Sequence, residues 1–287
     1  MAKIGLVMEG GAMRGMFTCG VMDVLMEEGI VFDGAIGVSA GATFGCNYKS
    51  RQIGRALRYN LKYCHDKRYG TFYSVRKYGD MYEKDFCYRE IPMILDPVDT
   101  KAYFANPMEF YVVMTDCESG DPVYQKIDVI NEKTMEYFRA GASMPIVSTP
   151  VEIDGKLYLD GGISDSIPLK KFMEMGYPFN VVVLTQPRGF AKKKFSSLML
   201  HLKGVRKYKN IQAALRKRHI MYNEETQFVF EQEELGNAFI IAPAEPLGIS
   251  HTEHDENELK RVYEAGRKIA QDRLEDLKKF IEDRITR

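Results

Sequence analysis

The sequence predicts a three-layer α/β/α fold with a mainly parallel central sheet and a helical C-terminal extension. Short apolar runs of strand length recur along the chain, and helical patterns lie between them. These runs are nearly continuous rather than alternating, which is typical of parallel strands that are buried on both faces. The segment 256–285 reads as one long charged helix and closes the chain.

The first two apolar runs share one plan of strand, small-residue turn and helix. Residues 4–8 form a strand that ends at Gly10-Gly11, and a helical pattern follows as far as Gly29. Residues 32–38 form a second strand, and small residues then open another helix. Further buried strands are expected at residues 110–115, 181–185 and 239–242.

Two stretches interrupt this plan. Residues 48–88 are rich in tyrosine and are expected to form helix and irregular loop. Tyrosine rings suit an acyl or headgroup channel, core packing or a structural lid equally well. Residues 188–218 contain eleven Lys and Arg residues and no acidic residue, and an acid-rich segment follows at 224–234.

Bulk composition excludes several function classes. The 40 Lys and Arg residues balance 40 Asp and Glu residues, so net charge gives no reason to expect nucleic-acid binding. The five cysteines lack paired spacing and are expected to be reduced. No signal peptide opens the sequence, and no window holds the about 18 to 20 apolar residues of a spanning helix. We therefore expect a cytoplasmic protein, at most peripheral at the inner face of the membrane.

The strongest chemical signal is a GxSxG motif. Gly37 to Gly41 read Gly-Val-Ser-Ala-Gly, between an apolar strand and the small residues that open a helix. A tight strand-to-helix turn would place the Ser39 hydroxyl where the helix dipole favours developing negative charge. The motif is short, and an ordinary helix start is the alternative. Its context favours a nucleophile.

A second glycine cluster lies at residues 9–15, which read Glu-Gly-Gly-Ala-Met-Arg-Gly. Backbone N–H groups in such a loop can face an anion. Neither a dinucleotide fingerprint nor a Walker loop fits, because the first would need glycine at position 12 and the second a Lys-Ser/Thr pair. The other reading is an oxyanion hole formed by Gly10, Gly11 and Ala12, with Arg14 supporting the loop or neutralising a phosphate.

A serine nucleophile also needs a proton acceptor. Asp160 ends an alternating strand, and Gly161-Gly162 after it let other backbone approach closely. An isolated Asp-Gly-Gly is most often only a turn. Histidine is the usual base, and His251 or His254 could serve in a triad. The residues alone leave both possibilities open.

Together these segments resemble the patatin-like phospholipase family, including its bacterial cytoplasmic members. The loop is similar to the family's Gly-Gly-Gly-x-Arg/Lys-Gly, with Ala12 in place of the third glycine. The GxSxG and Asp-Gly-Gly motifs occur in the family's order, and residues 139–145 resemble its small-residue and proline segment. The resemblance spans residues 4–185. It implies a catalytic domain at 1–185, with the basic stretch and helical region of 186–287 packed on it.

The resemblance implies a serine acyl hydrolase, that is, a phospholipase, lysophospholipase or esterase. Asp160 would orient Ser39 and receive its proton, and fatty acid would be released from a lipid ester. It implies no metal and no cofactor. The glycines that would support the two catalytic motifs are Gly37, Gly41, Gly161 and Gly162. A serine hydrolase with a histidine triad, and a non-catalytic lipid-binding or regulatory protein of the same fold, are the alternatives.

The basic stretch 188–218 suggests a partner. It mixes cationic and apolar side chains, which suits peripheral contact with an anionic membrane. A solvated face paired with the acidic segment is the alternative. The apolar residues of the stretch that favour membrane contact are Phe195, Leu198, Met199, Leu200 and Leu202.

Overall fold

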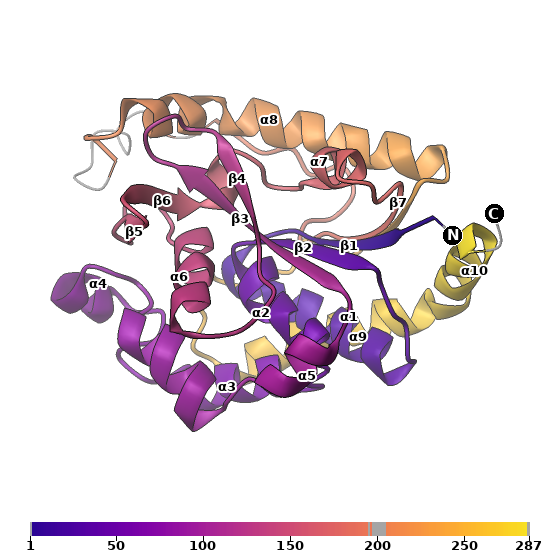
Figure 1. Cartoon of the computed structure of the whole chain (residues 1–287), viewed down its shortest axis with the longest axis horizontal. Helices are drawn as coiled ribbons and strands as arrows, with labels where there is room; N and C mark the ends of the chain where they lie inside the picture. The colour runs from indigo at the N-terminus through magenta and orange to yellow at the C-terminus, as the bar shows by residue number, and fades with distance from the viewer. Residues whose placement is uncertain (1, 195, 197–204, 286–287) are drawn as a thin grey trace.

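The computed structural model describes residues 2–194, 196 and 205–285, and it confirms the predicted three-layer α/β/α fold (Figure 1). One mixed sheet has the strand order β5-β6-β3-β2-β1-β7-β8, and β4 pairs with β3 beside this path. The parallel part consists of β1 (Ile4–Met8), β2 (Gly34–Val38), β3 (Glu109–Asp116), β7 (Phe179–Val183) and β8 (Ala238–Ile241). Its antiparallel edge is formed by β4 (Pro122–Lys126), β5 (Val151–Ile153) and β6 (Lys156–Asp160).

Helices cover both faces of the sheet (Figure 1). One face is covered by α1 (Gly15–Glu27), α2 (Ala40–Lys49), α6 (Glu132–Gly141) and α9 (Glu256–Asp272), and the other by α7 (Leu169–Glu174) and α8 (Lys209–Glu234). The first layer is extended by α3 (Arg55–Tyr63), α4 (Phe72–Tyr78), the π-helix η2 (Phe86–Leu95), α5 (Thr100–Ala105) and α10 (Leu274–Ile285). Among the described helices, none combines the length and the apolar character that crossing a membrane requires.

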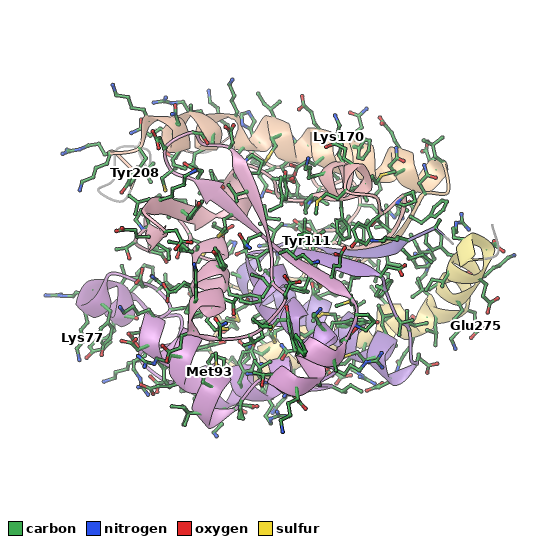
Figure 2. The ribbon with its side chains drawn as sticks, in the orientation of Figure 1. Lys77, Met93, Tyr111, Lys170, Tyr208 and Glu275 are labelled. Atoms are coloured by element: carbon green, nitrogen blue, oxygen red, sulfur yellow. The ribbon has the colours of Figure 1, made fainter. Side chains whose placement is uncertain are left out.

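Each strand feeds two separate cores, because successive side chains of a strand point to opposite faces. On β1, Leu6 and Met8 pack with the layer of α1 and α9, whereas Val7 packs with the layer of α7 and α8. On β3, Val112 likewise packs with the layer of α1 and α9, and Val113 with the layer of α7 and α8. Figure 2 shows the side chains that fill the space on both sides of the sheet. Burial on both faces explains why these strands read as continuous apolar runs.

The C-terminal region contributes to this same core. Strand β8 extends the sheet beside β7, and α9 crosses α1 at two glycines. A Cβ atom on Gly20 would lie 2.0 Å from the Tyr263 carbonyl oxygen, and one on Gly266 would lie 2.0 Å from the Phe17 carbonyl oxygen. Glycine is therefore required on both helices for their backbones to approach this closely.

Two features differ from the sequence prediction. The helix predicted at 256–285 is two helices, because the chain turns at Arg273, whose guanidinium donates to the Ile240 carbonyl at 3.2 Å. This turn brings Phe280 of α10 against Phe239 of β8, with ring centroids 5.7 Å apart. The edge strands β4 and β5 were not predicted, since β5 has only three residues and β4 lacks an apolar run.

Candidate active site

The predicted site residues lie at the carboxyl ends of three strands, two of them central and parallel and one in the antiparallel edge. Ser39 directly follows β2, the glycine loop directly follows β1, and Asp160 is the last residue of β6. The strand order reverses at β1, because β2 lies on one side of it and β7 on the other. Ligands in open α/β sheets bind at such a switch point, outside the carboxyl ends of the strands.

Ser39 occupies a strained turn between β2 and α2. Its backbone has φ 53° and ψ −123°, in a region that L residues rarely adopt. The motif glycines make this turn possible. A Cβ atom on Gly37 would lie 2.5 Å from the Gly41 carbonyl oxygen, and one on Gly41 would lie 2.4 Å from the Met8 carbonyl oxygen. The structure therefore forms the tight strand-to-helix turn that a GxSxG motif requires.

Asp160 lies beside Ser39 and is almost fully buried, with 6% of its surface exposed. Burial raises the pKa of its carboxyl above the ordinary value of 3.8, while hydrogen bonds from the Ser39 side chain and the Gly162 N–H partly oppose this. The Gly162 N–H donates to Asp160 Oδ1 at 2.8 Å. A Cβ atom on Gly161 would lie 2.4 Å from the Val113 carbonyl oxygen, so this glycine lets the motif pack against β3.

The glycine loop lines the same cavity as Ser39 and Asp160, whose volume is about 600 Å³. Gly10 is so close that a Cβ atom there would lie 2.9 Å from Ser39 Cβ. In the described part of the chain, the N–H groups of Gly10 and Gly11 donate to no protein acceptor, so they remain available to an anion. Ala12, the next residue of the loop, has φ 49°, a conformation that favours glycine.

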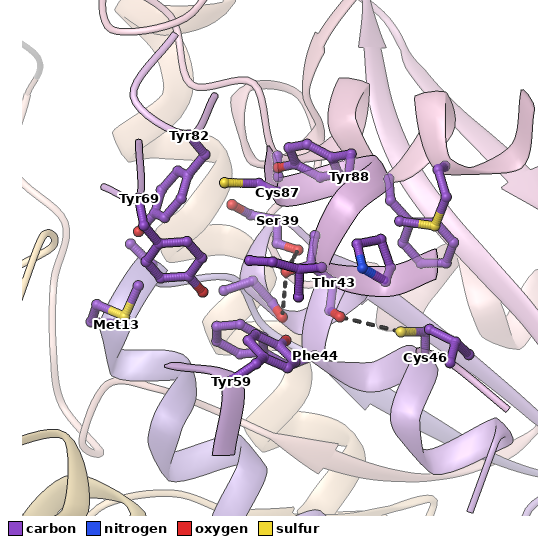
Figure 3. A pocket seen from close by; sticks show the side chains of 18 of the residues that line it. Met13, Ser39, Thr43, Phe44, Cys46, Tyr59, Tyr69, Tyr82, Cys87 and Tyr88 are labelled. Carbon is purple, nitrogen blue, oxygen red and sulfur yellow. Dashed lines mark hydrogen bonds between the residues drawn. The ribbon is translucent and has the colours of Figure 1, made fainter. Parts of the chain in front are cut away.

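A second cavity adjoins Ser39, and its wall is mainly apolar (Figure 3). Ser39, Ala12 and Met144 line both cavities. The tyrosine-rich segment supplies much of the wall. The aromatic side chains that line it are Phe44, Tyr59, Tyr69, Tyr82, Tyr88 and Phe138. Ser39 therefore lines two cavities. We call the one with Asp160 the polar cavity because its wall carries charged residues, although apolar side chains also line it.

The two candidate histidines lie in different places. His251 lines the polar cavity, where Arg14 Nη1 and His251 Nε2 are 3.1 Å apart. Burial lowers the pKa of His251, and the neighbouring Arg14, Lys192 and Arg218 lower it further. His254 Nδ1 instead contacts the Cys64 carbonyl oxygen at 2.5 Å.

Helix α8 adds cavity residues that the sequence did not single out. Arg218 donates through Nε to the Gly162 carbonyl oxygen. One turn later, the Tyr222 hydroxyl donates to Glu9 Oε1 at 2.8 Å. Lys192, from the loop after β7, lies 4.1 Å from the centre of the Tyr222 ring. Lys192 and Arg218 belong to the basic stretch 188–218, whose charge pattern is equally typical of a solvent-exposed face. Their position in the cavity therefore became apparent only from the fold.

The rest of the basic stretch bears on two alternatives, contact with an anionic membrane and a solvated face paired with the acidic segment 224–234. Arg188 pairs with Glu233 of the acidic segment at 2.6 Å, as expected for a solvated, paired face. The apolar residues Phe195, Leu198, Met199, Leu200 and Leu202 lie outside the described residues. Membrane contact through 188–218 therefore stays a prediction.

A pair of acidic side chains joins α8 to the loop after the Asp-Gly-Gly motif. Glu225 accepts from the Ser166 and Ile167 N–H groups, each at 3.1 Å, and its carboxyl interacts with that of Asp165. Asp165 also accepts from the Tyr124 hydroxyl at 2.6 Å. Burial raises the pKa of both carboxyls, and repulsion from Asp165 raises that of Glu225 further. The pair therefore holds a proton that the unfolded chain would release.

This pair predicts a pH-dependent stability. Because the folded pKa of Glu225 exceeds the ordinary value of 4.5, its contribution is fully present below that value and is lost as pH rises above it. Above that value, the free energy of unfolding should fall by up to about 1.4 kcal/mol per pH unit for the one proton involved. Glu225→Gln mimics the protonated acid, so its unfolding temperature should fall less between pH 5 and 9 than that of the wild type. Glu224→Gln, which removes an exposed carboxylate, should show the same pH dependence as the wild type. If the unfolding temperatures of all three proteins change equally with pH, the pair does not share a proton.

A possible metal-binding group lies outside the cavity. In the described residues, Cys64, His65 and Glu256 are the one set of three such side chains whose potential ligand atoms lie within 4.8 Å of one another. None of the three lines either cavity beside Ser39.

Comparisons with known proteins match two parts of the chain. The model of the family described as "Patatin-like phospholipase" matches residues 6–173, more than half of the chain, and includes Ser39, Asp160 and the glycine loop. The model of a domain of unknown function, DUF6363, matches residues 208–282, which contain α8, β8 and α9.

Several known proteins are similar to this chain. "Uncharacterized protein YjjU" of Escherichia coli is 29% identical over 191 residues, which cover 64% of this chain and 52% of that protein. "Lysophospholipase NTE1" of Meyerozyma guilliermondii is 26% identical over 194 residues, which cover 63% of this chain and 12% of that protein. The crystal structure of VipD from Legionella pneumophila aligns with a TM-score of 0.42 and 14% identity, covering 95% of this chain and 67% of VipD. The matched segments thus span about half or less of the two sequence relatives. On the match to residues 6–173, the chain belongs to the patatin-like phospholipase family.

Proposed function

We propose that this protein is a lipid acyl hydrolase in which Ser39 is the nucleophile and Asp160 is the base. The observation that carries the proposal is the placement of the Ser39 side chain and the buried Asp160 carboxyl in one cavity, where the two act on each other, while Ser39 also lines an apolar chamber. Family membership supports the same chemistry. Such a site suits a substrate with a polar head and an apolar chain.

The reaction follows from the positions of these groups. Asp160 accepts the hydroxyl proton as Ser39 Oγ attacks the ester carbonyl carbon. The carbonyl oxygen becomes an oxyanion, which the free N–H groups of Gly10 and Gly11 can stabilise, at about 3 kcal/mol per donor. The alcohol leaves with the proton from Asp160. Water then attacks the acyl-serine ester as Asp160 takes its proton; the bond from the acyl carbon to Ser39 Oγ breaks, Asp160 returns the proton to Oγ, and the fatty acid is released.

Burial makes an aspartate competent for this task. A carboxylate with an ordinary pKa is a weak base, and the raised pKa of Asp160 brings it closer to the working pH. The carboxyl remains ionised at neutral pH only if its charge is stabilised. The N–H of Gly162, the Ser39 side chain and the charge of Arg218 supply that stabilisation.

The tyrosine-rich segment provides the chamber for the acyl chain. Tyr59, Tyr69 and Tyr88 lie around the apolar cavity beside Ser39 (Figure 3). An acyl chain in this chamber would leave the ester carbonyl at the serine and the headgroup in the polar cavity. The apolar wall thus explains why a lipid ester, rather than a wholly polar ester, would fit.

Fatty-acid release from a panel of lipid esters tests this function. The panel contains monoacylglycerols, lysophospholipids and phospholipids of several chain lengths, together with a short-chain nitrophenyl ester. We expect release of free fatty acid from at least one lipid. If the wild-type protein binds these lipids without hydrolysing any of them, the non-catalytic lipid-binding alternative is correct instead.

A further inference from the structure

Three cationic side chains converge on the polar cavity from three separate segments. Arg14 comes from the glycine loop, Lys192 from the loop after β7, and Arg218 from the N-terminal half of α8. All three line this one cavity, which brings three positive charges into one site. Only Arg14 belongs to the part of the chain that the patatin-like model matches.

None of these cations forms a salt bridge among the described residues, although Arg218 acts on the Asp160 carboxyl, and Glu9 acts on Arg14 and Lys192, at longer range. Within residues 2–194, 196 and 205–285, none of the three forms an ion pair within 4.0 Å, and the remaining positions of the sequence contain no Asp or Glu. The nearby Glu9, 2% exposed, accepts instead from the Thr185 N–H at 2.6 Å and the Tyr222 hydroxyl. The cavity thus holds three cations against the carboxylates of Glu9 and Asp160, and an excess of one sign of charge in a cleft favours an oppositely charged ligand.

Hydrogen-bonding capacity is also left over in this cluster. Arg14 Nε is buried and has no hydrogen-bond partner among the described residues, although Nη1 contacts His251. Burial, and after it the positive charges of Arg218 and Arg14, lower the pKa of Lys192 to about 8. The carboxylates of Glu9 and Glu225 act in the opposite direction but do not cancel this lowering. The Lys192 ammonium and the Arg14 guanidinium are therefore costly to hold without an anion.

We propose that Arg14, Lys192 and Arg218 form a subsite for the phosphate group of an anionic lipid headgroup. The inference rests on the proposed hydrolase function and specifies its substrate class as phosphate-bearing lipid esters. Guanidinium groups suit the bidentate binding of phosphate oxygens, and an ammonium adds a point charge. The subsite lies in a cavity that shares Ser39, Ala12 and Met144 with the apolar chamber, so one lipid can fill both.

This arrangement assigns a role to the C-terminal region. Arg218 lies on α8 within the domain of unknown function, and the same helix anchors itself through Tyr222 to Glu9 and through Glu225 to the backbone at Ser166. The rigid attachment fixes the cation relative to the nucleophile. The region thus selects the headgroup, whereas the patatin-like part supplies the chemistry.

Binding to a turnover-deficient protein tests the subsite independently of catalysis. Ser39→Ala protein is titrated calorimetrically with a short-chain lysophosphatidate and with the monoacylglycerol of the same chain. We expect the phosphate lipid to bind about tenfold or more tightly, as for hydrogen bonds to a charged group. Adding Lys192→Gln should reduce this ratio at least about fivefold. Adding Lys192→Arg, which keeps the charge, should largely preserve it.

Lys193→Gln is the matched control, because Lys193 is exposed and does not line the cavity. It removes the same charge one residue away and should leave the ratio within about twofold. The unfolding temperature of each variant shows whether it is folded. If Lys192→Gln does not fold, Lys192→Met, which also removes the charge, takes its place in the comparison with Lys193→Gln. Equal binding of the two lipids, or equal loss in the Lys192 and Lys193 variants, would overturn the subsite.

Free phosphate is distinguished from a lipid headgroup in the same experiment. Inorganic phosphate and glycerol 3-phosphate are titrated alone, and both should bind more weakly than the phosphate lipid. If inorganic phosphate binds as tightly as the lipid, the ligand is free phosphate and the headgroup proposal is wrong. If the lipid preference is present but wild-type protein releases no fatty acid, the hydrolase proposal fails while the subsite stands.

Discussion

Ser39→Ala is expected to reduce fatty-acid release by at least about 10⁴-fold, because no other group would form the acyl intermediate. The backbone already accommodates an L residue at φ 53°, so alanine adds no new strain there. The free energy of unfolding should change by only about 1 kcal/mol, the value of one hydrogen bond. Steady-state rates on the best lipid of the panel, with thermal unfolding of the same samples, measure both effects.

Ser166→Ala is the matched control for this variant. Ser166 lines the same cavity, and its hydroxyl donates to the Gly162 carbonyl oxygen at 2.9 Å, but it does not follow β2 in a strained turn. We expect less than about a tenfold loss of rate. A Ser39→Ala protein that hydrolyses lipid normally, or an equal loss in both variants, would contradict the assignment of the nucleophile.

Asp160→Asn is expected to lower turnover by at least about 10³-fold while the protein remains folded. The asparagine oxygen can still accept from the Gly162 N–H, so the turn is preserved. The amide cannot take the Ser39 proton at any working pH. Rates measured beside the wild type, with circular dichroism as the check on folding, give the size of the loss.

The pH profile provides a second readout of the same base. Asp160 must be ionised to accept a proton, and burial raises its pKa above 3.8. Wild-type kcat/KM should therefore fall as pH decreases through that raised value, and the fall should be absent from the residual activity of Asp160→Asn.

A histidine base would behave differently. The double variant His251→Ala/His254→Ala should lower the turnover of a small neutral ester by less than about tenfold, because neither histidine is hydrogen-bonded to Ser39 or Asp160 in the described structure. A loss as large as that of Asp160→Asn would instead support the histidine triad.

Sequence reasoning found those features that local chemistry determines. The turn around Ser39 needs small residues at fixed positions, and Gly37 and Gly41 show this directly in the sequence. The apolar strands were equally readable, since burial on both faces leaves little choice of residue. The pairing of Ser39 with Asp160, which are 121 positions apart by subtraction of their numbers, came only from the family resemblance.

The rest of the site depends on tertiary structure. Lys192 and Arg218 resembled surface charges, because their approach to Arg14 is created by the packing of α8 and leaves no periodic signal. Glu9 gave no sign that it would be buried, and its partner Tyr222 is 213 residues away. The break at Arg273 was missed for a similar reason, since the contact with β8 that turns the chain is distant in sequence.

Peptide mapping after treatment with a fluorophosphonate tests the catalytic pair most directly. Such a probe phosphonylates an activated serine and leaves a mass increment that identifies the residue. A Ser39–Asp160 dyad predicts one adduct, on the peptide containing Ser39, that forms at least about 100-fold more slowly in Asp160→Asn protein. Labelling confined to another residue, or an unchanged labelling rate in the Asp160→Asn protein, would contradict it.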